Sequence, residues 1–413
     1  MRKKFIRLLK SRRIHARIKR KNRKDKLLRF GSLAILLTSL GFLLCILFSI
    51  LINGYNALTV TKVLLPISIN NELLPTYDSI KLREECINLI NNSLQKILQD
   101  VSFDAKKEIL NYSAHVELAR FLKQGTKTGK YEIWFTASST INAINKQQYV
   151  DDEYYQIFNK LKAEKRIEKF FNKSLFLKSD SQEPETAGIL GSLLGSLLTV
   201  AACLLFAIPI GVMAGIGINE FMPKGNIFTN IIEISIHNLA AVPAIIFGIV
   251  GFTIYLNIFG LPRSSPLVGG MTLSLMMLPN LVIATKHAFA SVPTTIKDAA
   301  FALGASHMQV ILHHSLPIAL PRIIQATILA VARILGESSP LLMIGMVAFI
   351  ADVPRGFFDP STTLPVQIYI WSSNPKAAFM ELAAVAIICL LLILLILNLV
   401  AHYFKKKFDS FTF

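Results

Sequence analysis

Six long apolar stretches constrain this chain more than any other feature of its 413-residue sequence. The hydrocarbon layer of a bilayer is about 30 Å thick, so a helix that crosses it needs roughly 20 mostly apolar residues. Each stretch is long enough, and hydrophobic residues make up 53% of the chain. The sequence therefore predicts an all-α polytopic membrane protein. The six predicted transmembrane helices cover residues 32–52, 193–217, 239–259, 267–289, 323–350 and 378–402.

The first apolar stretch is predicted to be a permanent anchor and not a cleaved leader. Its apolar core of about 20 residues is longer than the roughly 7–15 residues of a secretory signal. No small-residue cleavage site follows, since residues 53–56 read Asn-Gly-Tyr-Asn. We therefore expect the first transmembrane helix to remain in the mature protein.

Basic residues are concentrated at both ends of the chain. Residues 2–29 contain 15 Lys or Arg and one acid, Asp25. Lys405, Lys406 and Lys407 follow the last apolar stretch. Because basic flanks stay in the cytoplasm, both termini are predicted to be cytoplasmic, which six crossings require. A basic run can also bind nucleic acid, but its place beside a spanning helix favours contact with anionic membrane lipid.

A long polar segment separates the first two apolar stretches. Residues 53–186 carry 18 Lys or Arg and 17 Asp or Glu, and long domains are translocated largely regardless of charge. Residues 79–99 and 104–123 have helical spacing of apolar side chains, whereas residues 131–144 resemble a strand. The expected domains are a basic tail 1–30, an anchor 31–54, an inserted extracytoplasmic α+β domain 55–186, a membrane core 187–404 with five spans, and a tail 405–413.

Prolines interrupt three of the predicted spans. Pro209, Pro243 and Pro279 lie inside the second, third and fourth. A proline frees a backbone carbonyl, which in a membrane must find another partner. These positions are predicted helix breaks that line a translocation path, and the alternative is a packing kink.

The four cysteines point to no chemistry. Cys45, Cys203 and Cys389 lie in apolar stretches, and Cys86 is alone in the polar segment. No metal-ligand spacing is present. We expect no metal site and treat the cysteines as small buried hydrophobic residues.

The most informative segment is residues 291–321, SVPTTIKDAAFALGASHMQVILHHSLPIALP. By the count of crossings it is cytoplasmic. Two short helices are predicted, over residues 294–303 and 306–314, with Gly304 at the turn and Pro317 after the second. Glycine tolerates the positive φ of a sharp turn, and proline ends a helix. Two short helices at an angle make a rigid knob.

This segment resembles the EAA loop of ABC importer permeases, which has EAA, three residues, Gly, nine residues, Ile, one residue and Leu-Pro. Asp298 stands in place of the usual Glu, and His314 in place of the usual Ile. The matching residues are Asp298, Ala299, Ala300, Gly304, Leu316 and Pro317.

The resemblance implies a type I ABC importer permease fold, whose loop inserts into a groove on a separate ATPase subunit. ATP and Mg would be bound by that ATPase. The chain itself is then expected to bind no cofactor and to be no enzyme.

Four further stretches resemble phosphate transport permeases of the PstA family. They begin near Gly188 (GILGSLLGSLLTV), Asn238 (NLAAVPAIIFGIVG), Leu281 (LVIATKHAFASVP) and Ile328 (ILAVARILGESSPLLMIG). The resemblance implies inorganic phosphate as substrate and the bacterial inner membrane as location. It also implies a PstC-type second permease subunit, PstB-type ATPase subunits and a PstS-type periplasmic phosphate-binding protein. The inserted domain resembles the extra segment of longer family members.

Arg333 is the expected centre of the path. It lies 11 residues past Arg322, roughly 16 Å along a helix and so near the bilayer midplane. Burying Arg there costs at least about 2.5–3.5 kcal/mol, and Glu337, four residues on, is expected to pair with it. Either the two charges only neutralise each other, or Arg333 binds a phosphate oxyanion while Glu337 holds it in place. The further path candidates are Ser338, Ser339 and Asn238.

Three other polar residues are interpreted as interfacial or subunit contacts and not as ligands: Glu220, Glu233 and His237. Other functions stay open. The EAA loop says nothing about cargo, so a permease for molybdate, sulfate or phosphonate is the main alternative. A membrane-anchored sensor and a carrier driven by an ion gradient are disfavoured, because neither needs a loop that docks onto an ATPase.

Overall fold

The computed structural model of this chain describes residues 2–69, 79–98, 106, 108–123, 129–146, 152–223 and 225–409. Its contacts divide the chain into two units, Met1–Ile52 and Asn53–Phe413. Helix α1, Arg2–Ala57, runs through the first unit. Its part Leu27–Ala57 is long and apolar enough to cross a membrane, and its large apolar side chains are exposed, as lipid contact requires. The predicted first span is therefore a helix.

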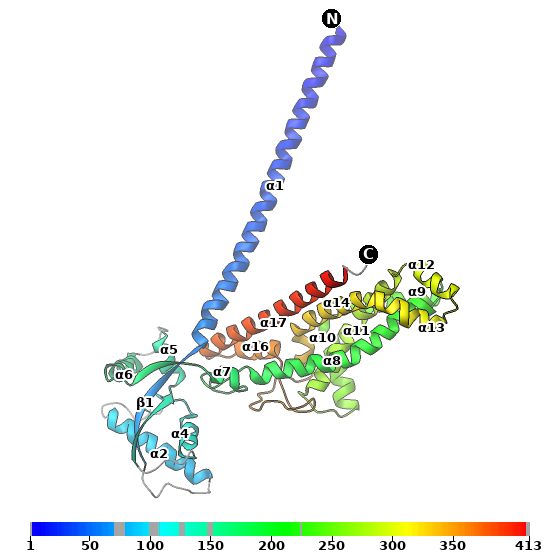
Figure 1. The fold of residues 1–413 in the computed structure, drawn as a ribbon. Helices are drawn as coiled ribbons and strands as arrows, with labels where there is room; N and C mark the ends of the chain where they lie inside the picture. The colour runs from blue at the N-terminus through cyan, green and yellow to red at the C-terminus, as the bar shows by residue number, and fades with distance from the viewer. Residues whose placement is uncertain are drawn as a thin grey trace. The chain divides into compact units, whose positions relative to one another are not determined.

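The inserted domain, residues 55–186, is built on a three-stranded antiparallel sheet with the order β2-β1-β3 (Figure 1). The central strand β1, Thr59–Ile69, buries alternate side chains, because successive residues of a strand point to opposite faces. Val63, Leu65, Ile67 and Ile69 form the apolar core on one face. The other elements are β2 Gly129–Thr136, β3 Ile167–Phe171, α2 Ser79–Ile97, α4 Ala114–Lys123, α5 Ser139–Asn145, α6 Asp152–Ala163 and α7 Ser174–Leu177.

The α+β class of this domain is as predicted, but two of its predicted elements are misplaced. The helix expected over 79–99 is present as α2. The helix expected over 104–123 is confirmed only as α4, and residues 101–105 and 107 lie outside the described part. The strand expected over 131–144 is wrong in its second half, where Ser138 caps helix α5. A serine hydroxyl that accepts from the first helical turn favours a helix start.

Helices make up the membrane core, which follows the inserted domain. Its helices are α8 Leu190–Ile216 with the π-helical turn η2 Gly217–Phe221, α9 Ile227–Ala240, α10 Ala244–Gly251 with η3 Phe252–Ile258, α11 Pro266–Ala290, α12 Thr294–Ala302, α13 His307–Gln309 with η4 Val310–Ser315, α14 Leu316–Leu335, α15 Ser339–Met343, α16 Leu364–Ser372 and α17 Ala377–Asp409. Five helices of the described chain can cross a membrane, or six if one bent pair counts as a span.

Two predicted spans need correction. The third, 239–259, corresponds to α10–η3 alone, Ala244–Ile258, which is short and meets the preceding helix α9, Ile227–Ala240, at 96°. The fifth, 323–350, is placed too late, because the long helix covers His307–Leu335. Gly336 closes that helix and only the short α15 follows, which is the usual role of glycine after a last helical turn. The second, fourth and sixth spans agree with α8, α11 and α17.

The predicted helix breaks are confirmed at one proline of three. Pro243 stands at the N-terminus of α10, where the bent pair turns. The breaks at Pro209 and Pro279 are wrong, since both residues lie inside the continuous helices α8 and α11. A proline removes only one hydrogen bond, so a helix held by its neighbours can continue through it.

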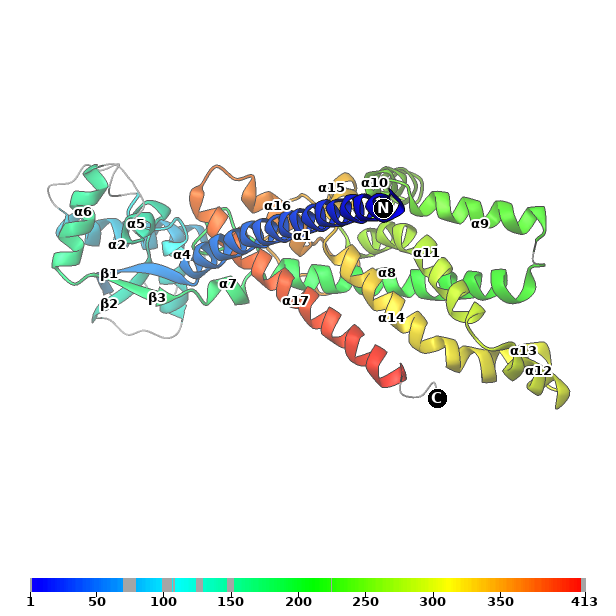
Figure 2. The same cartoon turned by 90° about the horizontal axis from the view of Figure 1, so that it is seen from above.

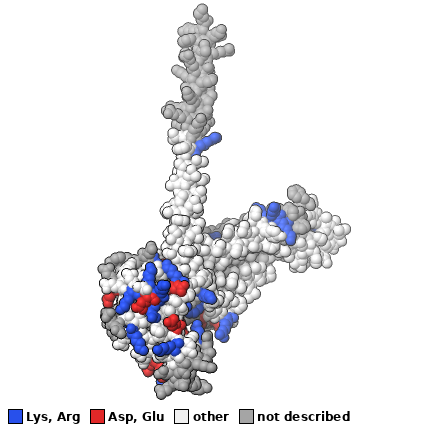
Figure 3. All heavy atoms as spheres, turned by 60° about the vertical axis from the view of Figure 1, so that its left-hand side comes forward, with Lys and Arg blue, Asp and Glu red and all other residues white. Residues whose placement is uncertain are grey.

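Small residues hold α8 against α11 (Figure 2). A Cβ built at Gly270 would lie 2.6 Å from the backbone oxygen of Thr199, and one at Gly215 would lie 2.8 Å from that of Val282. Close backbone approach through small residues is the usual way in which helices associate in a membrane. On the face drawn in Figure 3, charged side chains gather on the inserted domain and are sparse on the described helices of the membrane core.

Candidate translocation path and docking loop

The EAA loop, residues 291–321, has the predicted turn at Gly304 between two helices, but the prediction that Pro317 ends the second helix is wrong, because the chain is helical without a break from His307 to Leu335. Helix α12 ends before Gly304, whose φ of +84° turns the chain into α13. Ser306 and Gln309 form a capping box at the start of α13, which satisfies two free backbone N–H groups. Figures 1 and 2 show α12 and α13 at one end of the unit Asn53–Phe413, with the inserted domain at the other.

The tip of the EAA loop presents apolar side chains to its surroundings. Leu303, directly before the turn, is 90% exposed. Among the motif residues, Asp298 and Ala299 are exposed and Ala300 is buried. The other exposed apolar residues on the loop are Phe301, Met308 and Leu312. Exposed apolar residues are therefore found on both sides of the turn at Gly304.

The EAA loop is tied to the end of α8 by side chains. Lys297 Nζ lies 2.5 Å from Glu220 Oε1, and their side chains are 17% and 7% exposed. His307 lies between two aromatic rings, 5.3 Å from that of Phe221 and 5.9 Å from that of Phe301. Glu220, expected at an interface, is thus engaged within this chain.

A second ion pair joins α9 to α11 nearby. Lys286 Nζ lies 2.7 Å from Glu233 Oε1. His237 lines a small cavity beside this pair. Glu233 too is therefore engaged within the chain.

Arg333 lies in the last turn of α14 and lines a cavity of about 310 Å³. The side chains facing it across the cavity come from α11 and include Met276, Met277 and Asn280. These residues occupy the middle of α11, which runs over Pro266–Ala290. Arg333 therefore shares a cavity with residues from the middle of α11, although it lies in the last turn of its own helix α14.

The expected ion pair between Arg333 and Glu337 is wrong. The described residues form no ion pair with Arg333, and Glu337 Oε1 instead accepts from the hydroxyl of Ser339 at 2.8 Å. The reason is that α14 ends at Gly336, so Glu337 is no longer one helical turn above Arg333. Gly336 and Pro340 are signals in the sequence that could have located this end.

The other expected path residues lie apart from Arg333. Ser338 and Ser339 begin the short helix α15. Asn238 is an exposed residue near the end of α9 and does not line the cavity of Arg333. Asn280 is the polar residue that sequence reasoning missed, although an amide after Pro279 in an apolar stretch was a usable signal.

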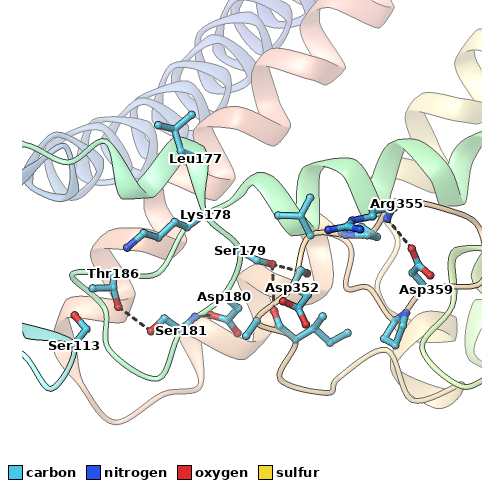
Figure 4. Close-up of a pocket in the computed structure, with 15 residues that line it drawn as sticks. Ser113, Leu177, Lys178, Ser179, Asp180, Ser181, Thr186, Asp352, Arg355 and Asp359 are labelled. Carbon is cyan, nitrogen blue, oxygen red and sulfur yellow. Dashed lines mark hydrogen bonds between the residues drawn. The ribbon is translucent and has the colours of Figure 1, made fainter. Parts of the chain in front are cut away.

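A larger cavity, of about 920 Å³, lies where the inserted domain meets the loop between α15 and α16. Figure 4 shows Lys178 at one end of its lining and Arg355 with Asp359 at the other. Asp180 and Asp352 add negative charge. Burial lowers the pKa of Lys178, and nearby Glu117 opposes that shift. Because charges of both signs line it, this cavity favours no single kind of ion.

A buried polar cluster fastens the inserted domain to the membrane core. Lys146 Nζ lies 2.5 Å from Glu381 Oε2, with both side chains 7% exposed. Close by, Asn111 donates to Glu185 Oε2 at 3.2 Å. Burial raises the pKa of Glu185 to about 7, with nearby Glu183 also raising it and Lys146 lowering it. Its other oxygen, Oε1, has no hydrogen-bond partner among the described residues.

The described residues contain no group of three His, Cys, Asp or Glu side chains placed to hold a metal ion. All four cysteines are free. Cys86 and Cys203 are buried, whereas Cys45 is exposed on α1, contrary to expectation.

Two protein-family models match this chain. Residues 207–410 match the family model of the binding-protein-dependent transport system inner membrane component. Residues 15–154 match a domain of unknown function, DUF3333.

Three bacterial relatives match about half of this chain. The phosphate transport system permease protein PstA of Haemophilus influenzae is 32% identical over 230 residues, which are 56% of this chain and 80% of that protein. PstA of Mycobacterium leprae is 28% identical, over 52% of this chain and 70% of that protein. The probable ABC transporter permease protein YqgI of Bacillus subtilis is 30% identical, over 52% and 77%. This multi-pass inner-membrane chain therefore belongs to the PstA family of ABC transporter permeases.

Proposed function

We propose that this chain is the permease subunit of an ATP-driven importer of inorganic phosphate. The observation that carries the proposal is Arg333, an exposed cation in the last turn of α14 that lines a cavity together with residues from the middle of α11 and has no ion-pair partner among the described residues. Such a charge costs at least about 2.5–3.5 kcal/mol. An anionic substrate that passes the cavity would offset that cost.

The geometry suits an oxyanion. The guanidinium of Arg333 presents a planar fork of N–H donors that matches phosphate oxygens. The amide of Asn280 shares the cavity lining and supplies one more donor group. The surrounding side chains are apolar, among them Met276, Leu329 and Ile334, and Arg333 itself is exposed and so accessible to an anion that passes the cavity.

The EAA loop is the proposed docking surface for a separate ATPase. Its exposed Leu303 and Phe301 supply the apolar contact, and the exposed carboxylate of Asp298 supplies a charge. ATP and Mg bind to that subunit, which is of the PstB type. A PstC-type second permease subunit completes the path, and a PstS-type protein delivers phosphate. In this arrangement the EAA loop and both termini are cytoplasmic and the inserted domain is periplasmic.

Labelled phosphate uptake in cells that depend on this chain tests the substrate. Arg333→Gln is expected to lower uptake by about tenfold or more, because a charge-assisted hydrogen bond contributes about 1.5–3 kcal/mol and 1.4 kcal/mol is a factor of ten. Arg322→Gln, on the same helix, is the matched control and should keep uptake. Undiminished uptake in Arg333→Gln, or competition by molybdate or sulfate stronger than by phosphate, would overturn the assignment.

The docking surface has its own test. A Cβ at Gly304 would meet no atom within 4 Å, so a substitution acts only through the positive φ. Gly304→Val should therefore abolish co-purification of the ATPase and phosphate uptake while the protein stays in the membrane. Gly304→Asn should retain much of both, because Asn adopts this backbone conformation more readily. Equal behaviour of the two variants would contradict the proposal.

A further inference from the structure

We propose that the ion pair between Lys297 and Glu220 transmits the movement of the EAA loop into helix α8. This inference rests on the proposed function, since it presumes that an ATPase moves the EAA loop. Glu220 and Lys297 are positioning residues here, because neither touches the substrate path around Arg333.

The pair is built for a fixed geometry. The two charged atoms lie 2.5 Å apart, and the Glu220 side chain is only 7% exposed. The amide of Asn219 also donates to Glu220 Oε1, at 2.8 Å. A buried carboxylate that accepts two hydrogen bonds is held more rigidly than an exposed one, whose long side chain moves freely.

The position of the pair in the chain makes it a link. The EAA loop is covalently continuous with α11 before it and α14 after it. Helix α8 has no such continuity, because residues 222–290 separate its end from the loop. Two side-chain contacts join η2, which continues α8, directly to the EAA loop: Glu220 with Lys297 and Phe221 with His307.

Helix α8 can carry that movement through the whole core. Together with η2 it runs from Leu190 to Phe221 without interruption. Near its other end, Ser196 Oγ accepts from the backbone N–H of Leu364 at 2.8 Å. Gly195 lies against Thr362 and Ser361, in the segment that leads into α16. One continuous helix, α8 with η2, therefore runs from the EAA loop to the opposite end of the membrane core.

The competing explanation is that the ion pair only holds the EAA loop in shape. The two explanations predict different effects when the ion pair is removed. A tether that only holds the loop in shape would, when cut, weaken ATPase binding. A transmitting link would leave binding and ATP hydrolysis in place and lower the phosphate transported per ATP. The ratio of transport to hydrolysis is therefore the decisive measurement.

The experiment uses the assembled transporter in proteoliposomes. Glu220→Gln and Lys297→Gln are each expected to keep ATPase association and hydrolysis but to lower the transported phosphate per ATP by at least about fivefold, a typical coupling factor. The double variant Glu220→Lys with Lys297→Glu should restore most of the ratio. Glu233→Gln, which breaks the neighbouring pair outside the EAA loop, is the control and should leave the ratio near that of the wild type.

Three outcomes overturn the inference. They are an unchanged ratio in both single variants, a loss of ATPase association in them, and a charge reversal that restores nothing. A wild-type assembly that binds no ATPase or moves no phosphate would instead refute the proposed function itself, so the two failures are distinguishable.

Discussion

The inserted domain and the membrane core are folded by opposite distributions of the same residue types. In the inserted domain the apolar side chains are inside: Val63, Leu65 and Phe135 have no exposed surface. In helix α8 the pattern is reversed, with Leu205 66% exposed and Thr199 1% exposed. The two regions differ because burying apolar surface is favourable in water, whereas in lipid it gives no such stabilisation.

The difference shows what holds each region together. The inserted domain depends on apolar burial, which contributes about 25 cal/mol for each Å² removed from water. The membrane core depends on close contact through small residues such as Gly215 and Gly270 and on hydrogen bonds between elements, such as that from the backbone N–H of Leu364 to Ser196 Oγ. Substitutions of the same kind should therefore have different effects in the two regions.

The largest expected difference is between two leucines. Leu65→Ala, in the core of the inserted domain, should lower its stability by about 2–5 kcal/mol, because it leaves a cavity. Leu205→Ala, on the exposed face of α8, should have little effect, because lipid fills the space. The midpoint of thermal unfolding of the full-length chain measures both. Equal losses at the two positions would break the comparison.

A smaller effect is expected from added bulk. Gly270→Ala places a Cβ 2.6 Å from the backbone oxygen of Thr199, so α8 and α11 must separate. Overpacking of this kind costs about 1–3 kcal/mol. Gly217→Ala, where a Cβ meets nothing within 4 Å, is the matched helical control. If both variants have the wild-type thermal midpoint and phosphate uptake, close contact does not hold these helices.

A third effect depends on pH and concerns Glu185, at the junction of the two regions. Its pKa is raised from 4.5 to about 7 in the folded protein. The folded state therefore holds the proton more tightly than the unfolded state. The resulting stability is fully present below about pH 4.5 and is lost as the pH rises through about 7.

The slope of that loss is about 1.4 kcal/mol for each pH unit between the two pKa values. Thermal midpoints of the full-length chain measured from pH 5 to pH 8 should show this decline. Glu185→Gln should flatten the decline, since a neutral amide carries no proton to lose. Glu132→Gln, an exposed carboxylate on β2, is the control. An identical decline in Glu185→Gln would show that the cause lies elsewhere.

Much of the fold was predictable because long apolar runs and basic flanks have one physical solution in a bilayer. The spans that became α8, α11 and α17 agree with the prediction to within a few residues at most of their ends. The turn of the EAA loop was equally predictable, since Gly304 is the residue that a turn with positive φ favours. Errors arose where apolar composition continues through a turn, as at Ala241 and Gly336.

The candidate site was less predictable, since it depends on which helices face each other. Arg333 stood out in the sequence as a cation in an apolar run, and its cost in lipid made it a functional candidate. Its neighbour Asn280 is 53 positions earlier in the chain. No local pattern joins two such residues.

The sequence by itself determined the class of this protein, its spanning segments and its EAA loop, because each follows from local hydrophobicity, charge or turn chemistry. Only the tertiary structure decided which polar groups meet. It placed Asn280 beside Arg333, separated Glu337 from Arg333 and brought Glu220 to Lys297. These pairings depend on helix ends and helix packing, which a few residues such as Gly336 and Gly270 set through backbone geometry that composition does not record.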